Sequence, residues 1–194
     1  FKPIYVLLGE NENKKQKMIK NLAQIVLNND LNEFNYNVLY ADTTSAKEVI
    51  NIANTFSFLG GNKLVLLKNF DEYSAEDKRI IAEYANSPTQ DTCLVVIDNT
   101  RPSKTADWYK KFDAEKENVD LQILWEYRYK ELVQVIFDGF KEYGKQADYA
   151  VCEAVASLLE NSQNSIDEEI KKIVDYAKDR EKITIDDIKD NIKK

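Results

Sequence analysis

The chain has 194 residues, 43% of them hydrophobic, and carries a formal net charge of −7 at pH 7. The hydrophobic content is enough for a folded core without disulfides, whereas the negative charge argues against a broad nucleic-acid-binding surface, which needs clustered Lys and Arg. The sequence has no histidine and no apolar run of membrane-spanning length, which excludes Ser-His-Asp catalysis, His-ligated zinc and a membrane-spanning helix.

The first two-thirds of the chain alternates short β-rich runs with segments of helical pattern. Strands are predicted for PIYVLLG (3–9), FNYNVLY (34–40), KLVLLK (63–68), TCLVVID (92–98) and VDLQIL (119–124). Helices are predicted between them, over about 13–28, from Ser45, from about Ser74 and over about 105–112. Ser45 and Glu48 have the spacing of a capping box. This alternation indicates an α/β fold with a five-stranded parallel sheet covered by helices on both faces.

The character of the sequence changes after Trp125, because every later segment has helical period and none reads as a strand. Thr184 is predicted to cap a short last helix. We therefore expect an α/β domain over 1–125 and a small all-helical domain over 126–194, with WEYRY (125–129) as the hinge. The apolar stripes of the helical domain are Leu132, Ile136 and Phe140; Val151, Val155, Leu158 and Leu159; and Ile166, Ile170, Ile173, Val174 and Ala177.

The two cysteines, Cys93 and Cys152, lie in apolar contexts without a partner at metal-ligand spacing, so we interpret both as small buried core residues. This cysteine usage fits a reducing compartment, and we expect a cytoplasmic protein with no metal site. The densest group of cations, Lys14, Lys15 and Lys17, is interpreted as a solvated helix face.

The loop GENENKKQ (9–16) stands where a phosphate-binding loop would follow the first strand. That loop needs Gly, four residues, and then Gly-Lys-Ser or Gly-Lys-Thr. Counted from Gly9, the three slots hold Lys14, Lys15 and Gln16. The second glycine, which lets backbone amides wrap a phosphate, and the hydroxyl that ligates magnesium are both missing. We therefore predict that the loop does not bind nucleotide and that the chain uses no cofactor.

The magnesium-binding acidic pair is missing as well. It should directly follow the apolar strand LVLL (64–67), but the next residues are Lys68 and Asn69. A lysine there would repel the metal, since like charges about 4 Å apart repel by roughly 1 kcal/mol in water and by more when buried. Asp71 and Glu72 lie beyond the strand end and are interpreted as residues of the turn and helix start. Asp98, at the end of another strand, is likewise interpreted as a turn residue.

The ordered blocks of the chain carry a family resemblance. PIYVLLGEN, SFLGGNKLVLLKN from Ser57, TCLVVID, SIDEEIKKIVDYA and ITIDDI resemble the delta subunit of the bacterial DNA polymerase III clamp loader. The resemblance implies a P-loop NTPase-like (AAA+) domain followed by a helical lid domain, in a subunit that has lost ATPase function. The family's third domain, the helical collar that assembles the loader, is absent from the sequence, so a fragment is expected.

The resemblance also implies the partners. They are the sliding clamp (the beta subunit) and the other loader subunits, delta prime and tau/gamma, with ATP bound by the neighbours. DNA is reached only indirectly through the complex, no membrane is involved, and the chain is linked to DNA-directed DNA polymerase activity only by its association with the holoenzyme. In this family an apolar pair at a helix tip plugs a pocket of the clamp and helps to open the ring. The matching positions are Phe58 and Leu59.

The residues by themselves leave other interpretations open. FSFLGG (56–61) reads as a helix end with a glycine stop, in which the apolar residues are ordinary core. Two other functions compete with the clamp loader subunit. The chain could be an active P-loop ATPase or nucleotide kinase that relies on Lys15 alone. It could also be an AAA+-derived interaction module with another partner.

Overall fold

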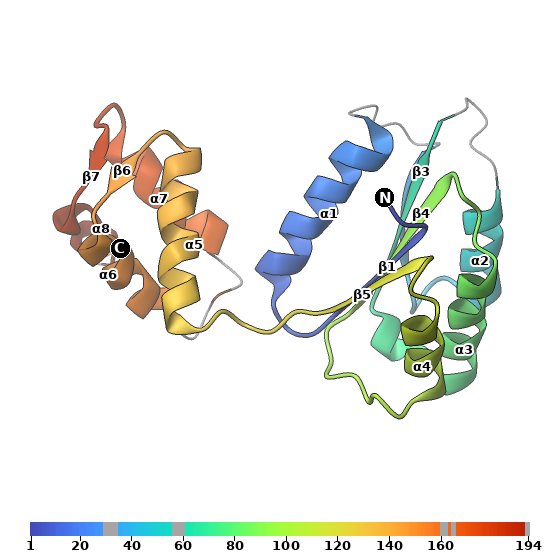
Figure 1. Ribbon diagram of the computed structural model, residues 1–194. Helices are drawn as coiled ribbons and strands as arrows, with labels where there is room; N and C mark the ends of the chain where they lie inside the picture. The colour runs from blue at the N-terminus through green and yellow to red at the C-terminus, as the bar shows by residue number, and fades with distance from the viewer. Residues whose placement is uncertain (29–34, 56–60, 160–162, 164–165, 193–194) are drawn as a thin grey trace. The chain divides into compact units, whose positions relative to one another are not determined.

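The computed structural model describes residues 1–28, 35–55, 61–159, 163 and 166–192 (Figure 1). The chain divides into two compact units. We call residues 1–10 and 14–125 the sheet unit, and residues 11–13 and 126–194 the helical unit. Each unit has its own hydrophobic core. No helix in the described ranges is both long and apolar enough to cross a membrane.

The sheet unit is built on a five-stranded sheet in the order β2-β3-β4-β1-β5, and every neighbouring pair is parallel. This confirms the predicted α/β fold and its five strands. The register places Leu8 of β1 beside Asp98 of β4, so the strands end together at one edge. The strands are β1 (Ile4–Leu8), β2 (Tyr36–Tyr40), β3 (Lys63–Lys68), β4 (Thr92–Asp98) and β5 (Val119–Ile123).

Helices cover both faces of the sheet. The helix α1 (Glu12–Leu27) lies on one face, and α2 (Ala46–Asn54), α3 (Ala75–Glu83) and α4 (Asp107–Ala114) lie on the other (Figure 1). The first half-turn expected for α4, from Thr105, is not helical, because Ala106 is extended and occupies the cap position. Two short 3₁₀ turns, Phe70–Glu72 and Tyr84–Asn86, precede and follow α3.

The sheet unit has a hydrophobic core on each face of its sheet, and alternating side chains of the central strands contribute to both. On β3, Leu64 and Leu66 pack with the residues of α1, whereas Val65 and Leu67 pack with the opposite helices. Because successive side chains of a strand point to opposite faces, a strand buried on both faces reads as a continuous apolar run. The predicted strands KLVLLK and TCLVVID are runs of this kind.

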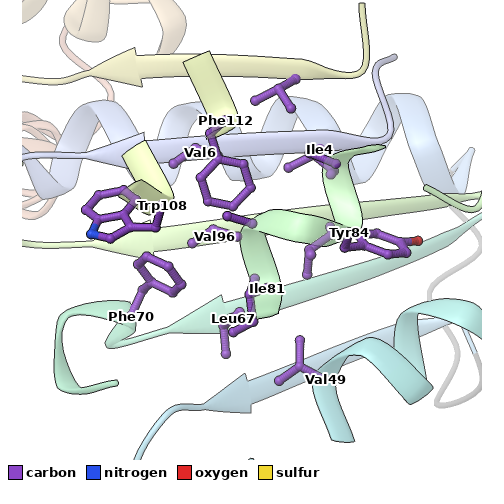
Figure 2. Packing of buried hydrophobic residues seen from close by; sticks show 14 of the residues in the cluster. Ile4, Val6, Val49, Leu67, Phe70, Ile81, Tyr84, Val96, Trp108 and Phe112 are labelled. Atoms are coloured by element: carbon purple, nitrogen blue, oxygen red, sulfur yellow. The ribbon is translucent and has the colours of Figure 1, made fainter. Parts of the chain in front are cut away.

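An aromatic cluster fixes the turn that follows β3. The ring of Phe70 packs edge to face against Trp108, with centroids 5.3 Å apart, and against Tyr73 at 6.1 Å. Figure 2 shows Phe70, Trp108 and Phe112 gathered on the face covered by α3 and α4. Edge-to-face aromatic pairs contribute about 0.5–1.5 kcal/mol beyond the area they bury. These contacts pack the turn that follows Asn69 against α4.

Serine caps begin two of the helices: Ser45, which was predicted as a cap, and Ser74, near which a helix start was predicted. The Ser45 hydroxyl accepts a hydrogen bond from the Glu48 amide at 3.3 Å, and the Ser74 hydroxyl accepts one from the Asp77 amide at 3.1 Å. Each bond satisfies an amide that the first turn of a helix leaves without a partner.

The helical unit contains α5 (Tyr129–Glu142), α6 (Tyr149–Leu159), α7 (Ile166–Ala177) and α8 (Ile185–Ile192). The predicted stripes form its core, with two differences. Leu158 is 42% exposed, because the buried stripe of α6 runs through Val151, Val155 and Leu159 instead. Val174 is only partly buried at the edge of the core. The two cysteines are buried and unpaired as predicted, Cys93 in the sheet unit and Cys152 in this one.

The expectation that nothing after Trp125 forms a strand is wrong. Two-residue strands, β6 (Gln146–Ala147) and β7 (Lys182–Ile183), pair in parallel. The Gln146 amide also donates to the Glu181 carbonyl oxygen at 2.9 Å. A two-residue strand has no measurable alternation, so hydrophobic periodicity gives no signal for it.

Candidate functional site

The carboxyl ends of β1, β3 and β4 bring the predicted nucleotide-site residues to one edge of the sheet. These strands are adjacent and parallel, so the residues that follow them emerge on the same side. Ligands of open α/β sheets bind at this edge. Gly9 follows β1, Asn69 follows β3, and Asn99 follows β4.

Gly9 begins the loop after β1 in a conformation that other residues rarely adopt. Its φ is +108°, and its amide donates to the Asp98 carbonyl oxygen at 3.1 Å. A Cβ at this position would lie 2.4 Å from the Leu124 carbonyl oxygen. The glycine is therefore required by the close approach of β1, β4 and the end of β5, with or without a phosphate in the loop.

The interpretation of Lys15 as part of a solvated helix face is wrong. Its side chain is 0% exposed, and its ammonium group donates a hydrogen bond to Asn99 Oδ1. The signal was present in the sequence, because Lys15 falls on the apolar stripe of α1 with Ile19, Leu22 and Val26. The lysine that would hold a phosphate in an active loop is thus bonded to the protein itself. Sequence reasoning missed its partner Asn99.

Lys14 and Gln16 do not join Lys15. The Lys14 ammonium donates to the Trp125 carbonyl oxygen at 3.0 Å, and Gln16 is exposed on the next turn of α1. The side chains of these three consecutive residues of α1 therefore lie in different environments. A phosphate-binding loop needs its amides and its lysine to converge on one point.

The Asp98 carboxylate is used within its own turn, as predicted. Its Oδ1 accepts hydrogen bonds from the Thr100 amide at 2.7 Å and the Thr100 hydroxyl at 2.6 Å. Asp98 is also buried. This turn places the next residue, Asn99, toward Lys15.

Lys68 and Asn69 stand where an active site would hold its magnesium. The Lys68 ammonium lies 5.7 Å from the centre of the Tyr40 ring, on the neighbouring strand β2. Asn69 adopts a left-handed conformation (φ 57°, ψ 39°), which Asn tolerates better than most residues, and so turns the chain into Phe70. Both residues serve the local structure of this strand end.

Asp71 and Glu72 belong to the 3₁₀ turn rather than to the start of α3. The Glu72 amide donates to the Asn69 carbonyl oxygen at 2.9 Å, and the Lys78 ammonium donates to the Asp71 carbonyl oxygen at 3.0 Å. The prediction of a turn role is confirmed, whereas the helix start is made by Ser74 and Asp77. In the part of the chain that the structure describes, no group of three or more Cys, Asp and Glu side chains is arranged to hold a metal ion.

An open cavity of about 380 Å³ lies at the carboxyl end of β2, next to this edge. Three carboxylates, those of Asp42, Glu72 and Asp77, line it together with hydroxyl groups. This lining repels a phosphate electrostatically. The cavity is therefore poorly suited to bind a phosphate.

The predicted clamp-binding pair, Phe58 and Leu59, lies outside the described residues. The structure describes the chain up to Thr55, just after α2, and again from Gly61, just before β3. Sequence reasoning also missed Lys63, whose side chain is buried at the start of β3 and reaches back to the end of α2.

Comparisons with known proteins point to one family. The family model described as DNA polymerase III, delta subunit, matches residues 5–122. The DNA polymerase III subunit delta of Bacillus subtilis (strain 168) is 27% identical over 196 aligned residues, which cover 96% of this chain and 56% of that protein. The chain therefore spans a little more than half the length of this relative.

Solved structures agree on the fold. The Bacillus subtilis DNA clamp loader delta protein (YqeN) matches with a TM-score of 0.71 and 24% identity, over 96% of this chain and 57% of its own. The Thermotoga maritima RuvB Holliday junction branch migration motor matches with a TM-score of 0.63 and 12% identity, over 98% of this chain and 61% of its own. At these identities the structures bear on the fold alone.

Proposed function

This chain belongs to the DNA polymerase III delta subunit family, and from that membership we propose that it is a clamp loader subunit in DNA replication that performs no nucleotide chemistry itself. In this proposal its task is to bind the sliding clamp and to help open the ring. Apart from family membership, the main support comes from Lys15, the lysine at the position that would hold a phosphate. It is buried and donates a hydrogen bond to Asn99 Oδ1.

The absence of ATPase activity is supported by the chemistry of the strand ends. The loop after β1 offers no second glycine and no hydroxyl at the metal-ligating slot, and a lysine follows β3 where the metal-binding acidic residue is needed. Catalysis of phosphoryl transfer depends almost entirely on positioned cations and donors around the phosphates. Because this chain lacks these cations and donors, we propose that ATP is bound by neighbouring loader subunits instead.

The contact with the clamp is assigned to Phe58 and Leu59. An exposed apolar pair that enters a pocket of its partner forms the kind of central contact that dominates the energy of a protein interface, with single residues worth about 2 kcal/mol or more. The pair helps to open the ring because it binds an opened or strained clamp better than the relaxed ring, and this difference in affinity shifts the ring toward opening.

The other partners follow from the family. They are the delta prime and tau/gamma subunits of the loader, which bring the chain to DNA indirectly. With a net charge of −7, the chain has no general electrostatic attraction for DNA of its own.

Clamp binding by the double variant Phe58→Ala/Leu59→Ala tests the proposal. The purified wild-type chain is expected to bind the cognate sliding clamp in surface plasmon resonance, and the double variant is expected to lose that binding while its melting temperature stays within about 2 °C of wild type. Ile25→Ala is the control, since Ile25 is an apolar side chain of α1 that is 62% exposed. This control variant should bind like wild type.

Two outcomes would contradict the assignment. If the double variant unfolds, the pair belongs to the core of the sheet unit. If it binds the clamp as tightly as wild type does, another surface makes the contact.

A further inference from the structure

A groove in the helical unit is basic, although the chain as a whole carries a net charge of −7. The groove has a volume of about 350 Å³ and lies between the end of α5 and the strands β6 and β7 (Figure 1). Three lysines and one carboxylate line it together with apolar groups. The lining includes Phe137, Lys141, Lys145, Ala147, Asp148 and Lys182.

Hydrogen bonds hold the turn that forms one wall of this groove. The Gly144 amide donates to the Lys141 carbonyl oxygen, and the next amide donates to the Phe140 carbonyl oxygen, each at 2.9 Å. These two bonds, with Gly144 at a φ of +68°, form the Schellman motif that ends many helices. The Lys145 ammonium group also donates to the Arg180 carbonyl oxygen at 2.8 Å, beyond the end of α7. The wall is therefore part of the folded helical unit.

Two of the three lysines form no ion pair with a described residue. Lys141 is exposed and has no such partner, and Lys145 bonds to carbonyl groups, which carry no net charge. The Lys182 ammonium lies 2.9 Å from the Asp148 carboxylate, and both side chains are more than half exposed. The lining therefore keeps a net positive charge.

An aromatic ring is exposed in the same groove. Phe137 lies on α5 four residues before Lys141, so the two side chains are neighbours on one side of the helix. The buried stripe of α5 runs through Leu132, Ile136 and Phe140. Phe137 lies outside this stripe and is 41% exposed. An apolar group of a partner that covered the ring would remove this apolar surface from water, which is favourable.

We propose that the groove binds an acidic peptide segment of a partner protein. An apolar side chain of the segment packs against Phe137, and its carboxylates lie beside Lys141 and Lys182. Most of a chain with a net charge of −7 repels such a segment, whereas this groove attracts it, so charge favours binding here over the rest of the surface. The volume is within the range of about 300–1,000 Å³ that is usual for binding pockets.

Nucleic acid fits the groove less well. Its binding depends on many cations that follow the phosphate backbone, whereas this groove offers three lysines on an acidic protein. The proposal depends neither on the clamp-binding pair nor on the nucleotide edge, because every residue that carries it belongs to the helical unit.

Fluorescence anisotropy with labelled peptides tests the proposal. The probes have the sequence Asp-Glu-X-Asp-Glu, in which X is Phe, Leu, Trp or Ser. We expect saturable binding of at least one of the first three probes, with a dissociation constant of about 100 μM or less, and at least tenfold weaker binding of the Ser probe. Added salt should weaken the binding. The proposal is overturned if none of the three apolar probes binds, or if the Ser probe binds as tightly as they do.

Two variants locate the site. Lys141→Glu reverses a charge in the groove, and its control, Lys171→Glu, makes the same change at an exposed position of α7 that does not line the groove. Phe137→Ser removes the ring, and its control, Leu158→Ser, removes an apolar side chain of α6 that is 42% exposed.

We expect each groove variant to bind the tightest probe at least fivefold more weakly than wild type, and each control to bind within twofold of wild type. Circular dichroism checks that each variant is folded. If Phe137→Ser does not fold, the exposed Lys141 decides the question through its own variant. Equal affinities of Lys141→Glu and Lys171→Glu would place the peptide elsewhere and overturn the proposal.

Other occupants of the groove would give different results. An oligothymidylate with as many negative charges as the probe should bind more weakly than the peptide does. If it binds more tightly, and Lys141→Glu abolishes that binding, the groove takes nucleic acid and the proposal is wrong. Sedimentation velocity should show wild type as a monomer. A dimer that Lys141→Glu dissociates would mean that a second copy fills the groove, which also contradicts the proposal.

Discussion

Lys15 is a charged side chain that the protein has enclosed completely. Burying an ammonium group is costly unless it is hydrogen-bonded, and the bond to Asn99 Oδ1 provides a partner on the loop after β4. The lysine of a working phosphate loop has to be available to its ligand. In this chain the residue instead connects α1 to the end of β4, so its contribution is to the stability of the fold.

Replacing this lysine should therefore destabilise the sheet unit. We expect Lys15→Met to lower the free energy of unfolding by about 1–3 kcal/mol, because the hydrogen bond from the charged ammonium group to Asn99 Oδ1 is lost. Lys20→Met, at an exposed position of the same helix, should change it by no more than about 0.5 kcal/mol. Urea unfolding measures both. A Lys15→Met variant as stable as wild type would mean that the bond contributes nothing.

Gly9 is constrained by neighbouring backbone. We expect Gly9→Ala to lower the free energy of unfolding by about 2 kcal/mol or more, since the added Cβ meets the Leu124 carbonyl oxygen and φ is positive. Gly61→Ala is the matched control in the same unit, with φ +83° and open space around its Cβ position. It should cost about 1 kcal/mol, from backbone strain alone. Equal losses in the two variants would show that the close approach has no effect.

It was easier to predict which residues occupy the candidate site than what each side chain contacts. The residues of the predicted degenerate site were identified from spacing alone: Gly9, Lys14, Lys15, Gln16, Lys68 and Asn69. That Lys15 is buried depends on a partner 84 positions later in the chain. Local sequence carries no record of such a pairing, although the stripe that Lys15 shares with Ile19 and Leu22 indicates the buried face.

At the scale of elements, the start of α8 shows how a predicted cap is made in practice. Thr184 stands at the cap, as expected, but the groups that close the turn belong to Asp187. Its carboxylate accepts from the Thr184 amide and hydroxyl, each at 2.8 Å, and pairs with Arg180 at 2.5 Å. Burial raises the pKa of Asp187, but the hydrogen bonds from Arg180 and Thr184 outweigh it and hold the pKa below its usual range.

This carboxylate makes the helical unit sensitive to acid. A lowered pKa in the folded state stabilises the fold above the ordinary Asp pKa of about 3.9, and that stability is lost as the pH falls below this value through the folded pKa. We expect Asp187→Asn to lower the free energy of unfolding by about 1–3 kcal/mol at pH 7, and the difference from wild type to shrink below about pH 4. Urea unfolding followed by circular dichroism at several pH values measures this.

Asp186→Asn is the control for that series. Asp186 lies in the first turn of the same helix, but its side chain is 82% exposed. Asp186→Asn should change the free energy of unfolding by less than about 0.5 kcal/mol, both at pH 7 and below about pH 4. An Asp187→Asn variant whose deficit stays constant down to pH 3 would contradict the assigned role of the carboxylate.

Elements with a long, regular pattern were predictable, and the shortest ones were not. The helix stripe Leu132, Ile136 and Phe140 and the capping serines gave clear signals, because each follows from local geometry. The β6–β7 pair depends on two short segments more than 30 residues apart. Its pairing is decided by the packing of the helical unit rather than by the pattern of either strand.

At the scale of the whole molecule, the sequence indicated two folded parts but not the order of the strands. The order β2-β3-β4-β1-β5 places β4 between β1 and β3, and this brings Asn99 to the same edge as Gly9 and Asn69. That arrangement follows from which strands pair, and pairing partners are not readable from one sequence. Only the folded structure therefore shows which residues of the candidate site lie close together.

Taken as a whole, the chain has an AAA+-like fold in which side chains at the carboxyl edge of the sheet, where the nucleotide site was predicted, bond to the protein itself. Lys15 is bonded to Asn99, the Asp98 carboxylate to Thr100, and a lysine follows β3. Under the proposed function, we expect such a molecule to act in a loader only through other proteins. Its affinity for the clamp should therefore be independent of nucleotide.

The most direct measurement is a calorimetric titration of the purified chain with the cognate sliding clamp, made once without nucleotide and once with saturating ATP and magnesium. The account predicts saturable binding with the same dissociation constant in both titrations, and no heat of binding when ATP and magnesium are added to the chain alone. Clamp binding that appears only with ATP, or saturable binding of ATP by the chain itself, would contradict it.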